Sequence, residues 1–156
     1  MAKKAERSSR ARSLSRRLAM QALYQWQMTQ QSSAELLNQY AEDEGYPEVD
    51  AEYFAEVLRG VTGDGEALDL ALGELIDRPV AQLDPIEHAV LLIGVYELAH
   101  RTEVPFRVVI NEGVELAKKF GATDGHKFVN AVLDRAARSM RAAEHAAATK
   151  TKTARA

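Results

Sequence analysis

Two groups of polar side chains near the start of the chain have the types and spacing to bind a charged ligand. Arg12 and Arg16 are four residues apart, so they share one face wherever this segment is helical. Their guanidinium groups suit backbone phosphates, which position a nucleic acid on a protein. Arg17, Gln21 and Tyr24 share a neighbouring face and add hydrogen-bonding groups and an aromatic ring. Charge, hydrogen bonding and stacking together are typical of proteins that hold single-stranded RNA.

A second candidate segment is residues 120–130, which read as a helix end, a tight loop and a new helix start. Lys127 and Asn130 can reach outward from the first turns of the new helix, and its free backbone N–H groups can meet a phosphate. Phe128 could stack on a base, although core packing is the more common role for a phenylalanine in this pattern. Asp124 is more readily explained as a helix cap than as a ligand contact.

Acidic residues on the segment 84–101 form a third candidate, a surface for a protein partner. Glu87 and Glu97 are its most prominent carboxylates. The residue pattern by itself favours the simpler alternative, in which these carboxylates face solvent.

Signals for catalysis and metal binding are missing from the sequence. There is no cysteine, and none of the four histidines lies in a zinc-binding pattern. The glycines at 60, 63 and 65 are not followed by the Lys-Ser/Thr pair of a phosphate loop, and no nucleophile elbow is present. We therefore expect no enzyme, no metal and no cofactor.

The net charge of −3 conceals an uneven distribution. Residues 1–30 carry seven bases and one acid, residues 31–104 carry 17 acids and three bases, and residues 105–156 carry ten bases and five acids. Basic ends attract phosphate backbones, and an acidic middle suits a basic protein partner. The alternative is an ordinary basic tail, but the helix dipole disfavours cations at a helix N-terminus, so their presence there favours a ligand.

Hydrophobic spacing predicts helices and no sheet. Apolar residues recur every three to four positions, and no useful length alternates with a period of two. The predicted helices span about 13–29, 33–40, 50–60, 64–77, 85–101, 105–120 and 124–141, with Ser13 or Ser15 as the first cap and the glycines at 60–65 as a break. We expect an all-α fold of about seven helices in two small bundles sharing one core.

The two ends differ in composition from this helical part. Residues 1–12 are polar and aperiodic, which predicts a flexible basic arm, and residues 142–156 predict a disordered polar tail. Residues 13–141 are then a helical RNA-binding domain. No apolar run is long enough for a membrane span or a secretory signal, and the lack of cysteine fits the cytoplasm.

Several motifs resemble those of one family, in the same order along the chain. They are Gln21-Ala-Leu-Tyr-Gln-Trp26, Tyr53-Phe54 with Gly60-Val61, Glu87-His-Ala-Val-Leu-Leu-Ile-Gly-Val-Tyr-Glu-Leu98, Val104-Pro-Phe-Arg-Val-Val-Ile-Asn-Glu-Gly-Val-Glu-Leu-Ala-Lys118 and His126-Lys-Phe-Val-Asn-Ala-Val-Leu-Asp134. Over about residues 10–140 the chain resembles the NusB family of bacterial transcription antitermination factors.

The resemblance implies an all-helical fold of two bundles and no catalysis. It implies pairing with NusE, a small-subunit ribosomal protein, and binding of the pair to the boxA element of nascent RNA. The pair then joins NusA, NusG and RNA polymerase in a complex that supports ribosomal RNA synthesis.

The resemblance also assigns roles to individual residues. Arg12 and Arg16 match the arginine-rich N-terminus of the family, although Ser13 and Leu14 interrupt the cluster here. The implied RNA-binding residues are Arg12, Arg16, Arg17, Gln21, Asp124, Lys127 and Phe128, and the implied partner-binding residues are Tyr24 and Glu87.

Two other functions remain open from the sequence. A NusB-like domain also precedes the catalytic domain of some ribosomal RNA cytosine methyltransferases, but no such domain follows in these 156 residues. Some family members form dimers, and the sequence does not decide between a monomer and a homodimer.

Overall fold

The computed structural model describes residues 2–155, with side chains for residues 3–149. This part of the chain is all-helical, which confirms the predicted fold class. It contains α1 (Ala2–Thr29), α2 (Ser33–Tyr40), α3 (Ala51–Gly63), α4 (Gly65–Gly73), α5 (Pro85–His100), α6 (Phe106–Phe120), α7 (Gly125–Met140) and α8 (Ala142–Arg155), with 3-10 turns at Tyr46–Glu48 and Val80–Gln82.

The helix starts follow from capping side chains. Asp84 accepts hydrogen bonds from the backbone N–H groups of Ile86 (2.9 Å) and Glu87 (3.1 Å), and Pro85 occupies the first turn of α5. Ser32 caps α2 and Asp50 caps α3 in the same way. All three starts confirm the sequence analysis, and the end of α1 at Thr29 does so too.

The first helix begins earlier than its serines suggest. Neither Ser13 nor Ser15 is a cap, because α1 is continuous from Ala2. The hydroxyl of Ser13 donates to Glu112 on α6 (2.6 Å), and that of Ser15 donates to the backbone carbonyls of Ala11 and Asp50. Their hydroxyls therefore join α1 to other parts of the molecule.

The predicted break in the run Gly60–Gly65 is confirmed, although α3 continues past Gly60 to Gly63. A Cβ atom on residue 60 would lie 2.2 Å from the ring of Tyr96, so the glycine lets α3 pack closely on α5. The interruption comes at Asp64, between α3 and α4.

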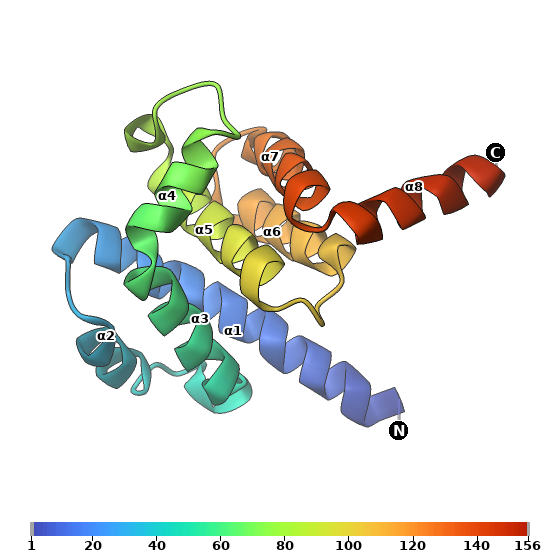
Figure 1. Ribbon diagram of the computed structural model, residues 1–156. Coiled ribbons are helices and arrows are strands. Elements are labelled where there is room, and N and C mark those ends of the chain that lie inside the picture. Colours follow the sequence, from blue (N-terminus) through green and yellow to red (C-terminus); the bar gives the residue numbers. More distant parts are fainter. Residues whose placement is uncertain (1, 156) are drawn as a thin grey trace.

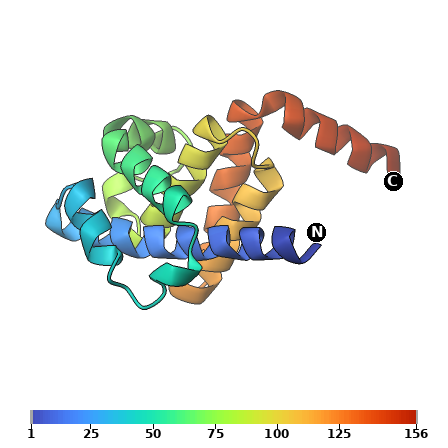
Figure 2. The same ribbon diagram turned by 90° about the horizontal axis from the view of Figure 1, so that it is seen from below.

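α5 is the central helix, with other helices packed on both sides of it (Figure 1). α1, α3 and α4 pack on one side, α6 and α7 pack on the other, and α2 lies against α1 and α3. Buried apolar residues from all of these groups form one continuous cluster. This arrangement is the predicted pair of bundles with a shared core. Figure 2, which shows the molecule from below, has α1 running along the length of the body.

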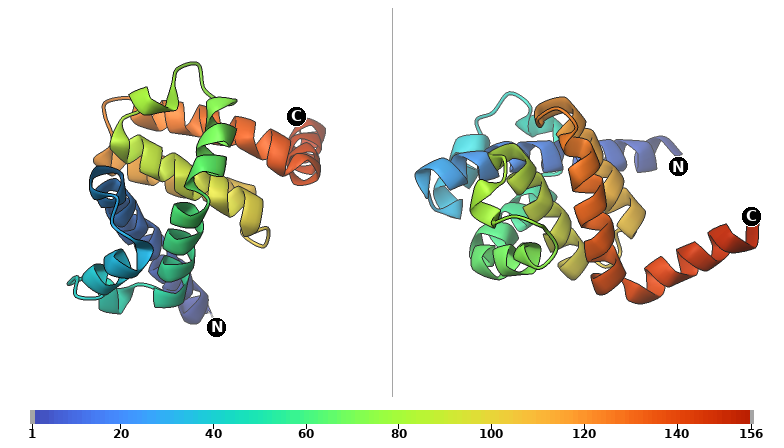
Figure 3. Two further views of the ribbon diagram at one scale, coloured as in Figure 1. Left: turned by 60° about the vertical axis from the view of Figure 1, so that its left-hand side comes forward. Right: turned by 90° about the horizontal axis from the view of Figure 1, so that it is seen from above.

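Both ends of the described chain are helical where the sequence predicts irregular structure. Residues 2–12 form the first turns of α1, and residues 142–155 form α8, which extends away from the body (Figure 3). Alanine, arginine and lysine are frequent in both segments and favour helix. The flexibility of the 1–12 arm and the 142–156 tail in solution stays a prediction.

The start of α8 is attached to the body by a buried arginine. The Arg141 guanidinium donates to the backbone carbonyls of Glu97, Leu98, Arg101 and Val104, at 2.8–3.2 Å. These bonds reach carbonyl groups in the last turn of α5 and in the segment that follows it, where helix ends leave carbonyl groups without a full set of partners. Helix α8 is thereby held at the junction between α5 and α6.

Candidate RNA and partner interface

Arg16, expected to bind RNA, is buried inside the molecule. Only 4% of its surface is exposed, and its guanidinium forms a bidentate ion pair with Glu97, with N–O distances of 2.8 and 2.9 Å. The hydroxyl of Tyr53 also donates to Glu97, and Glu112 lies 3.5 Å from Arg16. Arg16 is therefore removed from the RNA surface, and Glu97 from the candidate partner surface.

The pKa values of Arg16 and Tyr53 are shifted within this buried cluster. Burial alone would lower the pKa of Arg16, but the hydrogen bonds and charge of Glu97 outweigh it and raise the pKa. Burial raises the pKa of Tyr53, and the neighbouring Glu97 carboxylate raises it further. At physiological pH Arg16 is thus cationic and Tyr53 is neutral.

Arg12 is partly available at the surface. About a third of its side chain is exposed, its guanidinium lies 4.5 Å above the ring of Tyr53, and its Nε is 3.9 Å from Asp50. These contacts hold the start of α1 against α3. The exposed part of Arg12 can still meet a phosphate, so its role in RNA binding stays a prediction.

Arg17 connects the two segments that the sequence analysis nominated for RNA. It is exposed on α1, and its guanidinium lies 4.9 Å above the ring of Phe120, the last residue of α6. Gln21 follows on the same side of α1, half-buried in a cavity of about 410 Å³ that Arg17 also lines. The tertiary structure thus places Arg17 beside the start of the α6–α7 loop, while Gln21 faces the segment 43–49 on the other wall of the cavity.

The α6–α7 loop presents polar side chains outward. Asp124 has φ of 63°, a left-handed conformation that is uncommon for residues other than glycine. It occupies the N-cap position of α7, but its side chain accepts no capping hydrogen bond, so the capping explanation is wrong. The Asp124 carboxylate instead lies 3.4 Å from Nζ of Lys127, and both side chains are mostly exposed.

Phe128 combines the two roles considered for it. Its ring packs partly against the core, and the guanidinium of Arg78 lies 4.6 Å above the ring. Arg78 comes from the segment after α4, which the sequence analysis did not connect with this region. Stacking with Arg78 leaves Phe128 half-buried at the edge of the loop surface.

Glu87, expected to contact a protein partner, is buried as well. Only 7% of it is exposed, and its carboxylate accepts a hydrogen bond from the backbone N–H of Ala122 in the α6–α7 loop (3.1 Å). A Cβ atom on residue 125 would lie 2.5 Å from that carboxylate, so Gly125 is packed directly against it. This burial removes the Glu87 carboxylate from direct partner contact in this structure.

Tyr24 remains available to a partner, and it has an apolar neighbour that the sequence analysis missed. The exposed fractions of Tyr24 and Met28 are 41% and 56%, and the two lie one turn apart on α1. The same turn carries Gln27, which donates to the carbonyl of Pro85 (3.0 Å) and faces His88 (3.2 Å). The i, i+4 spacing of Tyr24 and Met28 was a signal that could have nominated both.

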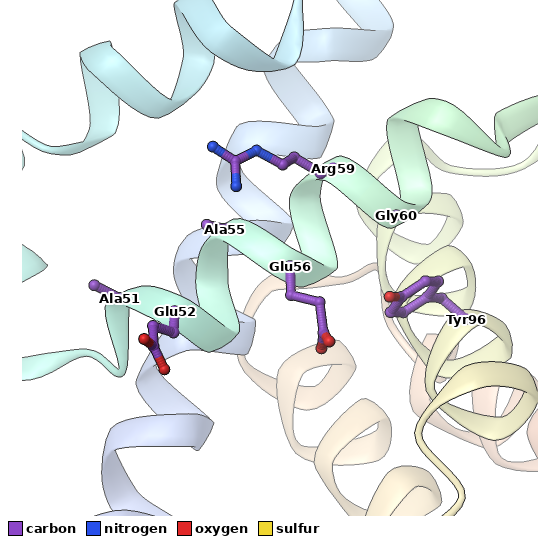
Figure 4. Close-up of a pocket in the computed structure, with 7 residues that line it drawn as sticks. All are labelled: Ala51, Glu52, Ala55, Glu56, Arg59, Gly60 and Tyr96. Atoms are coloured by element: carbon purple, nitrogen blue, oxygen red, sulfur yellow. The ribbon is translucent and has the colours of Figure 1, made fainter.

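Another open groove lies on the outer side of α3 (Figure 4). Its volume is about 640 Å³, and its lining residues are Ala51, Glu52, Ala55, Glu56, Arg59, Gly60 and Tyr96. None of the nominated residues lines it. Within residues 2–155 no group of three histidine or acidic side chains is arranged to hold a metal ion, and no helix is both long and apolar enough to cross a membrane.

Comparisons with known proteins agree with this architecture. Residues 13–138 match the model of the NusB family. The chain is 52% identical over 141 residues to the transcription antitermination protein NusB of Marinomonas sp. (strain MWYL1), covering 89% of this chain and 81% of that protein. It is 54% identical over 129 residues to NusB of Pseudomonas putida (strain W619), covering 83% of this chain and 78% of that protein.

Two solved structures share the fold. T. maritima NusB superposes with a TM-score of 0.71 at 24% identity, covering 81% of this chain and 89% of that one. A chain from a crystal structure of antitermination factors NusB and NusE in complex with dsRNA superposes with a TM-score of 0.74 at 26% identity, covering 81% and 96%. By sequence over most of its length and by fold, this chain belongs to the NusB family.

Proposed function

We propose that this chain is a transcription antitermination factor that binds boxA-type sites in nascent RNA together with NusE. Family membership supports antitermination and a non-enzymatic role. A relative of the same fold was crystallised with NusE and dsRNA, which supports both kinds of partner.

The observation that carries the RNA part of the proposal is the contact between Arg17 and Phe120. It joins an arginine-bearing face of α1 to the end of α6, about 100 residues away in the sequence, and Lys127 follows in the first turn of the next helix. Guanidinium and ammonium groups can bind phosphates, and aromatic rings in the region can stack on bases. With Arg16 buried, Arg17 and Lys127 are the central cations of the proposed site, and Arg12 lies farther along α1.

The partner part rests on Tyr24 and on charge. Tyr24 and Met28 form an exposed apolar pair on α1, and residues 31–104, which follow α1 in the sequence, carry 17 acids and three bases. A basic protein such as the one the family pairs with would be oriented by this field before the apolar contacts form. The heterodimer would join two RNA-binding surfaces and raise affinity through effective concentration.

The wider assembly belongs to the same proposal. We infer that the RNA-bound pair joins NusA, NusG and RNA polymerase, that it supports ribosomal RNA synthesis, and that it works in the cytoplasm, where nascent bacterial RNA is made.

The test is fluorescence anisotropy with a labelled boxA-type RNA. This chain, NusE and their mixture are titrated separately, with a scrambled strand and a boxA duplex as controls. We expect tight, sequence-selective binding of the single strand mainly by the mixture. Binding that ignores both the partner and the RNA sequence would contradict the proposal, and preference for the duplex would replace its single-stranded part.

A further inference from the structure

The buried carboxylate of Glu87 touches no surface, yet it lies between the two candidate surfaces of the protein. It stands in the first turn of α5, the turn whose Pro85 carbonyl accepts a hydrogen bond from Gln27 on α1. The neighbouring His88 contacts Gln27 and also Asp69 on α4, at 3.2 and 2.6 Å. One side of this turn therefore contacts the part of α1 that carries Tyr24 and Met28, which we call the Tyr24 region.

The other side of the same turn contacts the α6–α7 loop. The Glu87 carboxylate accepts the backbone N–H of Ala122 at 3.1 Å, and it packs against the backbone of Gly121 and Gly125. A Cβ atom at position 125 would be 2.5 Å from the carboxylate oxygen, so only glycine permits this approach. The residues that bracket Asp124 are thus fixed by a side chain from the central helix.

The loop needs such a fixed point because its backbone is strained. Asp124 has a left-handed conformation, without a capping hydrogen bond from its own side chain. Left-handed non-glycine residues persist only where the surrounding structure determines them. Two hydrogen bonds fix the backbone on both sides of Asp124. The Ala122 N–H donates to the Glu87 carboxylate, and the Gly125 N–H donates to the Ala122 carbonyl (2.9 Å).

We propose that Glu87 is a positioning residue for RNA binding, which holds the α6–α7 loop in the shape that presents Asp124 and Lys127, and which touches neither the RNA nor the protein partner. This inference rests on the proposed function. In this proposal Glu87 affects RNA binding indirectly, through its buried hydrogen bond with Ala122, and makes no direct contact with the protein partner.

Three variants test the contact from both of its ends. Glu87→Ala removes the acceptor, Glu87→Gln keeps an amide oxygen that can accept the Ala122 N–H, and Gly125→Ala pushes against the carboxylate from the loop. Glu66→Ala removes an equal charge from the exposed surface of α4, and Gly63→Ala adds a methyl group where no atom lies within 4 Å. These two are the matched controls.

RNA affinity is measured with the partner present, and partner affinity is measured without RNA. We expect Glu87→Ala and Gly125→Ala to weaken RNA binding by about tenfold, the size of one lost buried hydrogen bond to a charged group. Partner binding without RNA should change less than about twofold, and Glu87→Gln should stay within about threefold of the original RNA affinity. Because Glu87→Ala makes room for the methyl group at 125, the double variant should be no worse than Glu87→Ala alone.

A readout that needs neither ligand is the exchange rate of the Ala122 amide proton, followed by NMR, with circular dichroism to verify folding. We expect exchange at least about tenfold faster in Glu87→Ala and near the original rate in Glu87→Gln. Unchanged exchange in Glu87→Ala would overturn the positioning role. If Glu87→Ala weakens partner binding as much as RNA binding, the positioning role is wrong and Glu87 contacts the partner directly. If Glu87→Ala leaves the RNA affinity unchanged, the role of Glu87 is purely structural.

The two proposals fail in different ways. If the unmodified pair shows no selective RNA binding, the proposed function fails, and the exchange of the Ala122 amide still decides whether Glu87 fixes the loop. If the unmodified pair binds selectively and the Glu87 variants do not differ from it, only the positioning role fails.

Discussion

At the scale of single residues, the arginines of α1 divide into a structural one and functional candidates. Arg16 and Arg17 are adjacent in the sequence, but one is enclosed by Glu97 and Tyr53 and the other lies exposed over Phe120. A helix turns by about 100° per residue, so neighbouring side chains point to different environments. Identical residue types therefore have unrelated roles here.

Arg16 stabilises the fold. We expect Arg16→Ala to reduce the free energy of unfolding by roughly 3–5 kcal/mol, because the Glu97 carboxylate is left buried without its cation. Urea unfolding followed by circular dichroism measures it. An Arg16→Met, Glu97→Leu double variant is the control, and it should be closer to the original stability because no unpaired charge remains. A loss in Arg16→Ala below about 1 kcal/mol, as for an exposed pair, would contradict this assignment.

Arg17 is the candidate for ligand binding. With about four phosphate contacts in the proposed RNA site, the log–log salt dependence of the pair has a slope near −3, about −0.7 for each contact with a single strand. We expect Arg17→Ala to reduce the magnitude of that slope by about 0.7 and to leave stability unchanged. Arg59→Ala, which removes an exposed arginine from the α3 groove, is the control. An equal change of slope in both variants would mean that general charge, rather than a contact at Arg17, is being measured.

At the scale of helices, the ends of α5 and α6 are held by the start of α8. Glu144 accepts hydrogen bonds from the Arg141 guanidinium (2.8 Å) and from the backbone N–H of Phe106 at the start of α6 (3.0 Å). Burial would raise the pKa of Glu144, but the Phe106 N–H and Arg141 outweigh it, so the pKa is below its ordinary value. One carboxylate thus connects α8 to the first turn of α6.

This connection should weaken in acid. A carboxyl group with a lowered pKa in the folded state stabilises the fold fully above its unfolded pKa of about 4.3, and the contribution is lost as the pH falls through the lower folded value. The effect is below about 1 kcal/mol, since the side chain is 40% exposed. We expect Glu144→Gln to be less stable at pH 7, with a difference that shrinks toward pH 3 in urea unfolding. A difference that is constant over this range would show that the carboxylate charge is not responsible.

At the scale of the whole molecule, the uneven charge matches the two kinds of partner. Most of the acids lie in residues 31–104, while the proposed RNA site is built from α1 and the α6–α7 loop, outside that range. The acids can attract a basic protein and the basic residues an anionic RNA, and the two kinds of charge meet at the cavity that Arg17 and Gln21 line together with Asp43, Glu44 and Glu48.

The partner site at Tyr24 can be tested at this scale. We expect Tyr24→Ala to weaken NusE binding by about fivefold or more, because a partly exposed tyrosine at the centre of an interface is commonly a dominant contact. Isothermal titration calorimetry without RNA measures the affinity. Val108→Ala, at an exposed apolar residue of α6, is the control and should bind normally. If Val108→Ala weakens binding and Tyr24→Ala does not, the partner site must be moved away from the Tyr24 region.

The sequence by itself determined the helices, most of their ends and the shared core. Repeats of apolar residues, the Asp84-Pro85 start and the Ser32 and Asp50 caps are local signals, decided within a few neighbouring residues. It also nominated both RNA segments. Arg17, Lys127 and Tyr24 are exposed in the structure, and their roles in binding stay predictions.

Only the tertiary structure decided which polar side chains are exposed and which are bonded inside the protein. Arg16 and Glu97 are 81 positions apart and Glu87 and Ala122 are 35 apart, so no local pattern shows that they are bonded inside the protein. The same holds for Gly60, which local rules interpret as a break and which α3 uses to pack on Tyr96. The physical reason is that a side chain's exposure depends on what the rest of the chain places against it.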